Sequence, residues 1–296
     1  MRGDSEGTVE EDLLVKVLLL HPGAMGASIG ASLKDAGSDV VCLLSGRSDS
    51  TRERAQRAGL DEAGSLPEAL SSVEMVLSVC PPDAARAVAQ AVGEAGFDGT
   101  YLDANAIAPT TAAAIAKDVE AHGMRYVDGG IIGPPAWTDG ATRLYLSGEQ
   151  ATDVAPRMNG GPLDVRAIEG GPTAASALKM SYASWTKGSF ALLLAIRAFA
   201  RSNGVEPHLL AEWDASTDKL GMDVAARSER AAVSAAPKAW RFVGEMEEIS
   251  EAFVSSSLPG GFHHGAAEVY RALEGFKDAT DLDVDDIFEV LARGHE

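Results

Sequence analysis

The chain has 296 residues, of which 46% are hydrophobic and 23% charged, a composition that suits about two folded domains and excludes wholesale disorder. Its 44 acidic and 25 basic residues give a formal net charge of −19, which argues against the basic surface that nucleic-acid binding requires. No apolar run approaches the roughly 18 residues of a membrane span, and the acidic N-terminal residues do not resemble a signal peptide. Cys42 and Cys80 cannot form a disulfide framework or a zinc site. We therefore expect a cytoplasmic protein with no metal, membrane or nucleic acid as its partner.

Short apolar runs alternate with helix-forming segments through the first half of the chain. The runs predict strands at residues 13–20, 40–44, 73–79, 100–103, 125–128 and 142–146. The segments between them predict helices at residues 26–36, 52–58 and 84–95. Strands that alternate with helices are typical of βαβ units, so we expect a doubly wound parallel sheet.

The pattern changes near residue 172. From Thr173 to Arg201 there is no proline and only one glycine, Gly188, which predicts a single helix about 40 Å long at ~1.5 Å per residue. Further helical segments follow it. The sequence thus predicts a frayed N-terminus at residues 1–12, an α/β domain at residues 13–172 and an all-α domain at residues 173–296, with the long helix joining the two domains.

The loop after the first predicted strand is rich in glycine and leads directly into the first predicted helix. In a G-x-G-x-x-G dinucleotide-binding loop, glycines let the backbone approach the pyrophosphate, which lies at the N-terminus of the following helix. Gly23 and Gly26 fit the second and third glycine positions, whereas His21 stands at the first. We predict a Rossmann domain whose loop binds the cofactor through Pro22, Gly23, Ala24, Met25 and Gly26.

The end of the second predicted strand selects the cofactor. An acidic residue there would bind the ribose hydroxyls of NAD. This chain instead has Ser45, Arg47 and Ser48, and an arginine fork can pair with the 2′-phosphate of NADP. We therefore predict NADP, with Arg47 as a solvated loop residue the alternative. Arg52 and Arg54 are interpreted as exposed helix charges.

Five segments resemble the superfamily of β-hydroxyacid dehydrogenases, 6-phosphogluconate dehydrogenases and imine reductases. Residues 21–26 resemble its opening G-x-G-x-M-G, and residues 77–82 resemble the strand that lies along the nicotinamide half of the cofactor. Residues 102–109 resemble its D-x-S-T-x-x-P segment, with Asn105 in place of serine. The resemblance implies that Cys80, Pro81 and Asn105 also bind the cofactor.

The last two of these five segments resemble the substrate-binding and catalytic segments of that superfamily. Residues 128–134 are similar to its D-A-P-V-S-G-G loop, and residues 177–182 resemble the helix that carries a catalytic lysine, K-M-x-x-N. The C-terminal region resembles a largely uncharacterised bacterial branch. Two positions depart from the pattern, because Ile132 replaces the loop serine and Ala183 replaces the asparagine. The predicted substrate pocket comprises Ile132, Gly133, Ala183 and Thr186.

Lys179 stands at the lysine position of that helix. Tyr182 and Thr186 follow it by three and seven residues, so all three share one helix face. A desolvated lysine could give a proton to the atom that receives the hydride electrons, and Tyr182 could do so instead. The alternatives are that Lys179 forms a structural salt bridge and that Tyr182 is an ordinary core aromatic residue.

These features predict an NADP-dependent dehydrogenase or reductase that transfers hydride between NADPH and a small carbonyl or hydroxy compound. The two departures favour an alternative, an imine reductase acting on a C=N bond. A second alternative is an NADP-binding sensor without turnover. Turnover of any member of a panel of hydroxyacids, ketones and cyclic imines would exclude the sensor.

The second half of the chain indicates how the protein would form oligomers. A helix that is apolar around most of its circumference is normally buried, and in the resembling families this helix builds an interlocked dimer. We therefore expect a homodimer formed through the C-terminal helices. In this dimer, His263 or His264 of one chain could contribute to the cleft of the other chain. Glu245, with its acidic neighbours, is interpreted as solvated surface, and Trp137 either covers the nicotinamide or caps the sheet.

Overall fold

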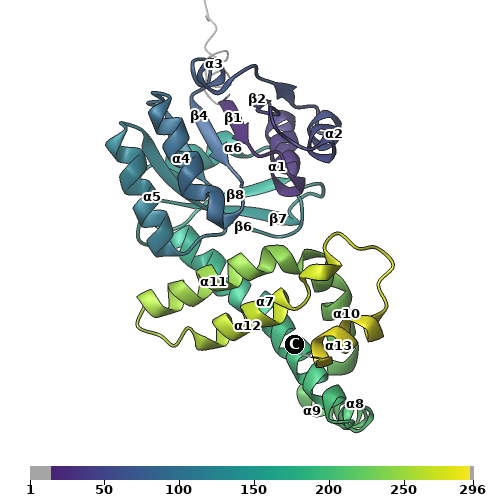
Figure 1. Cartoon of the computed structure of the whole chain (residues 1–296). Helices are drawn as coiled ribbons and strands as arrows, with labels where there is room; N and C mark the ends of the chain where they lie inside the picture. The colour runs from purple at the N-terminus through teal and green to yellow at the C-terminus, as the bar shows by residue number, and fades with distance from the viewer. Residues whose placement is uncertain (1–14, 294–296) are drawn as a thin grey trace, which may run out of the picture. The chain divides into compact units, whose positions relative to one another are not determined.

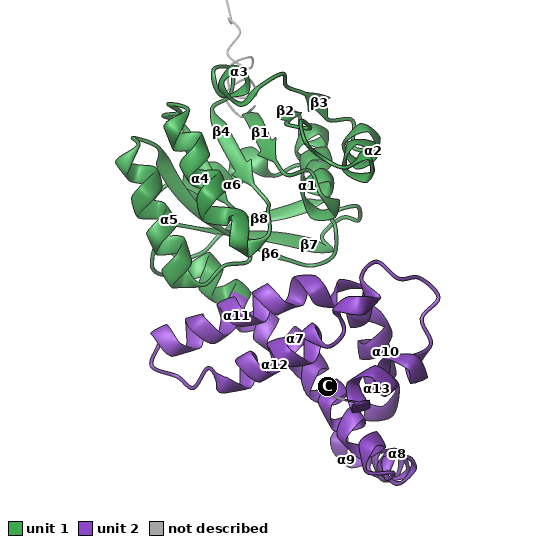
Figure 2. Ribbon diagram, viewed as in Figure 1, with its two compact units in different colours: residues 1–179 green, residues 180–296 purple. Residues whose placement is uncertain are grey.

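The computed structural model of the chain describes residues 15–293. The predicted frayed segment and the first two residues of the first predicted strand lie outside this part. The chain divides into two compact units, residues 1–179 and residues 180–296 (Figure 2). The division falls inside the long predicted helix.

The first unit is built on one eight-stranded sheet with the order β3-β2-β1-β4-β5-β6-β7-β8. Neighbouring strands are parallel except for β6 and β7, which are antiparallel. The strands are β1 Lys16–Leu20, β2 Asp39–Cys42, β3 Asp61–Glu62, β4 Met75–Ser78, β5 Thr100–Asp103, β6 Arg125–Ile132, β7 Thr142–Ser147 and β8 Leu163–Ala167. The central strands are buried on both faces, which explains why they are almost continuously apolar in sequence.

Helices cover both faces of the sheet (Figure 1). One apolar core joins the sheet to α1 Ala24–Asp35, α2 Asp49–Arg57 and α6 Ala151–Met158. The other joins it to α3 Leu66–Leu70, α4 Ala85–Glu94 and α5 Pro109–Ala121, with a short 3-10 helix, η2 Pro82–Ala84, before α4. The predicted doubly wound α/β architecture is confirmed.

The strand order places a topological switch point between β1 and β4. The chain moves outward from β1 to β3 and then returns to β4 on the other side of β1. In such sheets the ligand crevice lies at the carboxyl ends of the strands beside the switch point. The glycine loop after β1, the arginine loop after β2 and the loops after β4 and β5 all begin at this edge.

The second unit contains only helices within the described residues. The long helix α7 Ala174–Ser202 begins in the first unit and continues into the second, in close agreement with the predicted helix. It is followed by α8 Glu206–Ala215, α9 Thr217–Leu220, α10 Val224–Ala235, η3 Ala236–Lys238, α11 Ala239–Ser255, α12 Gly261–Arg271, η4 Glu274–Phe276 and α13 Val284–Arg293. Over residues 15–293, none of these helices is both long and apolar enough to span a membrane.

Buried ion pairs hold the second unit together. Arg197 of α7 is almost fully buried and pairs with Glu206 of α8 at 2.5 Å. Lys187, also on α7, pairs with Glu245 of α11 at 2.6 Å, and both side chains are largely buried. The interpretation of Glu245 as solvated surface is therefore wrong, because its apolar neighbours on α11 place that helix face in the core.

Candidate functional site

The glycine loop forms an open cradle at the start of α1. Gly23 is the N-cap of this helix, and no side chain caps the first backbone N–H groups. A Cβ atom added at Gly23 would meet nothing within 4 Å, whereas one at Gly26 would lie 2.5 Å from the carbonyl oxygen of His21. Gly26 is thus required for packing, and Gly23 leaves room for a ligand to approach the backbone. Free N–H groups at a helix N-terminus favour a phosphate there.

His21 adopts the backbone conformation that the first glycine of the motif provides elsewhere. Its φ of +66° is in the left-handed region, which histidine tolerates less readily than glycine. Burial, with a contribution from the charge of Arg47, lowers the pKa of His21 to about 4, so the ring is neutral at pH 7. Within residues 15–293 its buried Nδ1 has no hydrogen-bond partner. This unsatisfied atom and the open cradle fit a nicotinamide dinucleotide.

Arg47 lies within electrostatic reach of both the glycine loop and the loop after β4. Besides its effect on His21, its charge opposes the burial that raises the pKa of Cys80 to about 11. Ser48 lies in the same turn, and its hydroxyl is 3.1 Å from those of Ser50 and Thr51. Ser45 is exposed at the start of the loop. The guanidinium of Arg47 is therefore available on the cradle side of the sheet edge.

The other arginines of this region have different environments. Arg52 donates to the carbonyl oxygen of Leu44 at 2.7 Å and lies 3.6 Å from the carboxylate of Glu62, so it fastens α2 to the end of β2. Arg54 and Arg57 line a cavity of about 390 Å³ together with Ala24, Ala27 and Trp137. Trp137 is 57% exposed and lies beside α1 and α2.

Asn105 fastens the ends of β4 and β5 to each other. Its side-chain oxygen accepts a hydrogen bond from the backbone N–H of Cys80 at 2.6 Å, and its amide nitrogen donates to Ser78 at 3.1 Å. The backbone N–H of Asn105 in turn donates to Asp103. Both the oxygen and the nitrogen of the Asn105 side chain thus form hydrogen bonds within the protein. These bonds fix the conformation of the Cys80–Pro81 loop. A shorter serine would not carry the same pair of bonds.

Asp103 is the buried carboxyl group beneath this loop. It also accepts a hydrogen bond from the hydroxyl of Tyr126 at 3.4 Å. Burial raises the pKa of Asp103 to about 7, because its few hydrogen bonds do not replace the lost hydration. The group can therefore hold a proton close to neutral pH.

Asp128, in the middle of β6, anchors the first turn of α7. Its carboxylate accepts hydrogen bonds from the backbone N–H of Ser176 at 2.8 Å, from the hydroxyl of Ser176 at 2.5 Å and from the hydroxyl of Ser147 at 3.0 Å. Ser147 also accepts from the backbone N–H of Ala175 at 2.9 Å. These bonds satisfy two of the N–H groups that every helix leaves unpaired at its start.

The same junction sets the position of Lys179. A Cβ atom added at Gly130 would lie 2.5 Å from the carbonyl oxygen of Ala175 and 3.2 Å from the Cβ atom of Lys179. Only a glycine therefore lets α7 cross β6 this closely. Gly129 makes a similar approach to the end of β5, where a Cβ atom would lie 2.9 Å from the carbonyl oxygen of Asp103. Half-buried Lys179 is thus held beside Gly130, near the carboxyl end of β6.

The remaining predicted site residues are divided between the units. Ile132 is buried at the end of β6, and Gly133 follows it with a φ of +132°. Ala183 is buried on α7, and Thr186 lines a cavity of the second unit. Their common substrate pocket stays a prediction. Tyr182 is 47% exposed, so it is not a core aromatic residue of this chain.

The two adjacent histidines of α12 differ sharply. His263 is buried in its own unit between the rings of Phe253 and Phe262, at centroid distances of 4.4 and 5.1 Å. Burial lowers the pKa of His263. It therefore cannot be offered to a partner chain without repacking, whereas His264 is exposed.

The sequence reasoning missed the residues that hold the α7 junction. Asp128, Ser147 and Ser176 are separated by 19 and 29 residues along the chain, so only the fold brings them together. One signal was available. A serine in the first turn of a long helix suggests a capping role there.

Replacing Asp128 by asparagine tests this anchor. Asparagine retains one acceptor oxygen, but its NH₂ group would face a hydrogen-bond donor of Ser147 or Ser176 instead of accepting from it. We expect Asp128→Asn to lower the free energy of unfolding by ~1.5–3 kcal/mol, the effect of losing a hydrogen bond to a charged group. Amide hydrogen exchange in residues 174–180 should also accelerate.

The matched control is Asp139→Asn, which changes the same charge at an exposed loop position. Its free energy of unfolding should change by no more than about 0.5 kcal/mol. Equal stability and equal exchange in the two variants would show that Asp128 does not anchor the helix.

Comparison with known families agrees with this geometry. Residues 19–155 match the NAD binding domain of 6-phosphogluconate dehydrogenase, and residues 200–273 match a domain of unknown function, DUF1932. No curated protein matches the chain.

Solved structures of similar fold span nearly the whole chain. A conserved protein of unknown function described as similar to 3-hydroxyacid dehydrogenases is 26% identical, with 88% of this chain and 98% of that chain covered and a TM-score of 0.64. Mycobacterium tuberculosis 3-hydroxyisobutyrate dehydrogenase with L-serine is 20% identical (94% and 99% covered, TM-score 0.69). A reductive aminase from Aspergillus terreus in complex with NADPH4, cyclohexanone and allyl amine is also 20% identical (93% and 98% covered, TM-score 0.53). Residues 19–155 are therefore similar to the NAD binding domain of 6-phosphogluconate dehydrogenase and residues 200–273 to DUF1932, and the chain has the fold of these dehydrogenase and reductive aminase structures.

Proposed function

We propose that the protein is an NADP-dependent oxidoreductase that transfers hydride between NADPH and a small carbonyl or hydroxy compound. The observation that carries this proposal is that the unit with an open cradle at Gly23 also holds a lysine, Lys179, against Gly130 near the carboxyl end of β6. The family match supports the cofactor class, and the 3-hydroxyisobutyrate dehydrogenase structure supports the substrate class.

Different residues of the chain would bind the cofactor and transfer the proton. The first turn of α1 and the glycine loop would hold the pyrophosphate, and Arg47 with Ser48 would bind the 2′-phosphate. The bound cofactor would supply or accept the hydride. Lys179 would hold the proton that the substrate oxygen gains on reduction, with Tyr182 as the alternative donor. The Cys80–Pro81 loop, fixed by Asn105, would orient the nicotinamide half.

Imine reduction is the second candidate. Ile132 and Ala183 replace the polar residues that hold a substrate carboxylate in the hydroxyacid enzymes, and an apolar Ile132 suits a less polar substrate. The reductive aminase structure shares the fold and was solved with NADPH4, a ketone and an amine. Reduction of a cyclic imine that exceeds reduction of all hydroxyacid-derived ketones would favour this candidate.

Arg47 should determine the preference for NADP. We expect Arg47→Ala to weaken NADPH binding by roughly 10- to 150-fold, which corresponds to ~1.5–3 kcal/mol for a lost charge-assisted pair, and to leave NADH binding nearly unchanged. Fluorescence titration with each cofactor measures the effect. Arg166→Ala, at an exposed arginine on β8, should change neither affinity. Equal losses for NADPH and NADH in Arg47→Ala would mean that Arg47 does not touch the 2′-phosphate.

Lys179 should affect the rate and not the fold. Methionine keeps the length and packing of the lysine stem, so we expect Lys179→Met to retain stability and NADPH affinity while kcat falls by ~10²–10⁴-fold. If Lys179 were only a structural cation, the change would instead lower stability by ~3–5 kcal/mol. A third pattern, with Lys179→Met active and Tyr182→Phe inactive, would assign the proton to Tyr182.

Lys187 offers a matched contrast two turns further along α7. It is paired with buried Glu245, so Lys187→Met should show the stability loss that Lys179→Met lacks. Melting curves, NADPH titrations and steady-state rates on the three variants separate these assignments. Unchanged turnover in both Lys179→Met and Tyr182→Phe would remove both residues from the chemistry.

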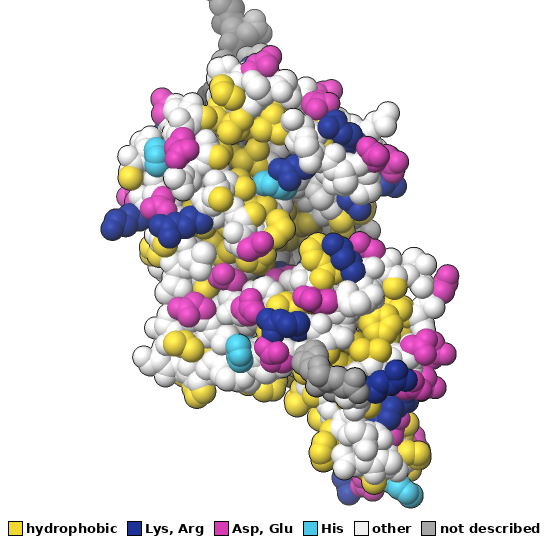
Figure 3. Space-filling model, viewed as in Figure 1, with side chains coloured by type: hydrophobic (Ala, Val, Ile, Leu, Met, Phe, Trp, Pro, Cys, Tyr) yellow, Lys and Arg dark blue, Asp and Glu magenta, His cyan; other side chains and the backbone are white. Residues whose placement is uncertain are grey.

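A homodimer formed through α7 is part of the proposal. Trp185, Leu192 and Phe199 recur every seven residues on this helix and are 60%, 47% and 69% exposed. Seven-residue spacing places them along one face, and such an apolar stripe is typical of a helix that packs against another chain. Hydrophobic side chains are visible on the surface of the second unit in Figure 3.

Sedimentation at micromolar concentration should give about twice the chain mass of 30.8 kDa. Leu192→Glu should shift the protein to a monomer without unfolding it, because the charge would be buried in the interface. Ala113→Glu, at an exposed position of α5, should leave the dimer intact. A wild-type monomer would contradict the proposal.

A further inference from the structure

The second unit contains a cavity whose lining residues, apart from Thr186, have no role in the proposed oxidoreductase reaction. It lies between α7 and the start of α10 and has a volume of about 350 Å³. Its lining residues are Thr186, Phe190, Met222, Asp223, Arg227 and Arg230. This volume is within the range of ~300–1,000 Å³ in which proteins bind small molecules, and such sites combine apolar walls with a few polar groups.

Arg227 is held in this cavity by weak neutral contacts. Its guanidinium donates to the hydroxyl of Ser189 at 3.3 Å, lies 3.7 Å from the sulfur of Met222 and is 5.4 Å from the ring centroid of Trp185. A cation over an indole face is attracted to it, so the side chain is oriented without being neutralised. Oriented arginines are suited to recognise carboxylates.

The charges around the cavity favour an anion. Over residues 15–293, neither Arg227 nor Arg230 forms an ion pair, whereas Arg197, Arg201 and Arg271 of the same unit are all paired with carboxylates. Asp223 is the one acidic lining residue, and its carboxylate caps α10 by accepting from the backbone N–H of Ala226 at 2.9 Å. Two guanidinium groups thus face one carboxylate, in a chain whose net charge is −19.

We infer that this cavity binds a small organic carboxylate, whose acid group pairs with Arg227 and Arg230 and whose short apolar chain packs on Phe190 and Met222. Two arginine forks match the two oxygens of a carboxylate, and the apolar walls exclude a bare inorganic anion as the preferred ligand. The site is complete within the second unit, so it stands independently of the nicotinamide chemistry.

Hexanoate is a suitable probe, because it joins one carboxylate to a flexible apolar chain. Isothermal titration of the full chain without NADPH should give a Kd of ~0.1–1 mM, the range of a small fragment. Arg227→Gln and Arg230→Gln should each weaken hexanoate binding by at least about 10-fold. Because Arg230 is exposed, Arg230→Gln preserves the fold even if Arg227→Gln perturbs it.

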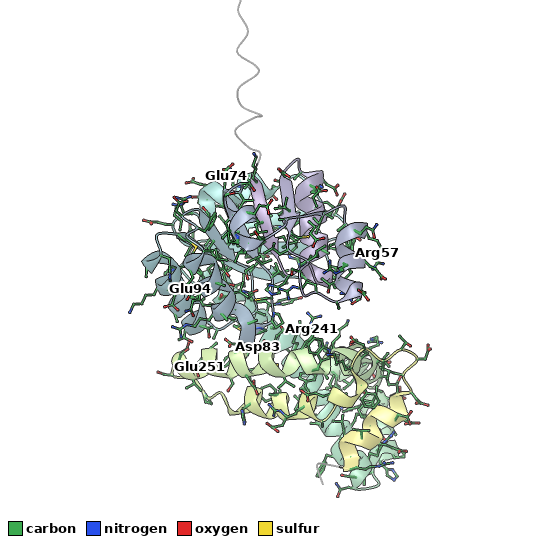
Figure 4. All side chains as sticks on the ribbon, turned by 45° about the horizontal axis from the view of Figure 1, so that its top comes forward. Arg57, Glu74, Asp83, Glu94, Arg241 and Glu251 are labelled. Atoms are coloured by element: carbon green, nitrogen blue, oxygen red, sulfur yellow. The ribbon has the colours of Figure 1, made fainter. Side chains whose placement is uncertain are left out.

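Two controls make the test specific. Arg241→Gln removes an exposed arginine of α11 that does not line the cavity and is labelled in Figure 4, and it should leave the Kd within 2-fold of wild type. Hexanol, which lacks the acid group, should not bind detectably. Hexanoate should also change the tryptophan fluorescence, and Trp185→Phe should remove that change.

The inference is overturned if hexanoate does not bind, or if the Arg227→Gln, Arg230→Gln double variant binds it as tightly as wild type does. When a reducible substrate is in hand, competition by hexanoate would assign the site to the acid group of the substrate, and altered turnover without competition would assign it to an effector. Because binding is measured without cofactor, its failure would leave the oxidoreductase proposal intact.

Discussion

The hydrogen bonds that Asp128 accepts from Ser147 and Ser176 are the interaction on which the arrangement of the candidate site depends. A carboxylate buried within a strand is costly unless donors surround it, and here each donor comes from an element that the site needs in place. Ser147 ends β7, and Ser176 lies in the first turn of α7. One buried charge therefore joins the sheet to the helix that carries Lys179.

The strand order of the sheet brings the other loops of the candidate site together. Because β1 and β4 are neighbours while the chain between them runs outward through β2 and β3, the loops after these strands open on one edge. The glycine loop, Arg47, and the Cys80 loop held by Asn105 all follow from that order. Gly130 of β6 then lets α7 approach the sheet more closely than any side chain would allow.

Two lysines of α7 differ in their surroundings, and we propose different roles for them. Lys187 is enclosed and has a carboxylate at 2.6 Å, which is the environment of a cation that holds two helices together. Lys179 is half-buried at the sheet edge and is positioned by its backbone. Among the arginines of the second unit, Arg197 and Arg201 form ion pairs between helices, whereas Arg227 and Arg230 line the cavity.

Much of the fold could be predicted from the sequence, because a buried parallel strand and a long apolar helix leave patterns that need no tertiary knowledge. Six strands of the first unit and the extent of α7 agree with the prediction, whereas β3 and β8 were not foreseen. The two residues of β3 are exposed acids that carry no strand signal, and β8 alternates apolar with charged residues over only five positions. The position of the glycine loop between β1 and α1 could be predicted for the same reason. The left-handed backbone of His21 was not, because a histidine reveals nothing about its φ angle until the loop is built.

The site itself was only partly predictable. The Asp128 network joins residues far apart in sequence, and the burial of Glu245 depends on which face of α11 meets the core. Both require the packed structure. The same limit applies to the cavity lined by Arg227 and Arg230, where an unpaired charge can be recognised only after all possible partners have been placed.

A crystal structure of the protein with NADPH would test the central claim most directly, namely that the β6–α7 junction presents Lys179 to a dinucleotide bound in the glycine cradle. The account predicts the pyrophosphate at the N-terminus of α1 and the 2′-phosphate at Arg47. It also predicts that the amine of Lys179 faces nicotinamide C4, where it can donate a proton to the carbonyl oxygen of a substrate whose carbonyl carbon lies ~3–3.5 Å from C4. A dinucleotide bound outside the cradle, or a nicotinamide ring with Lys179 turned away from it into a structural ion pair, would contradict the account.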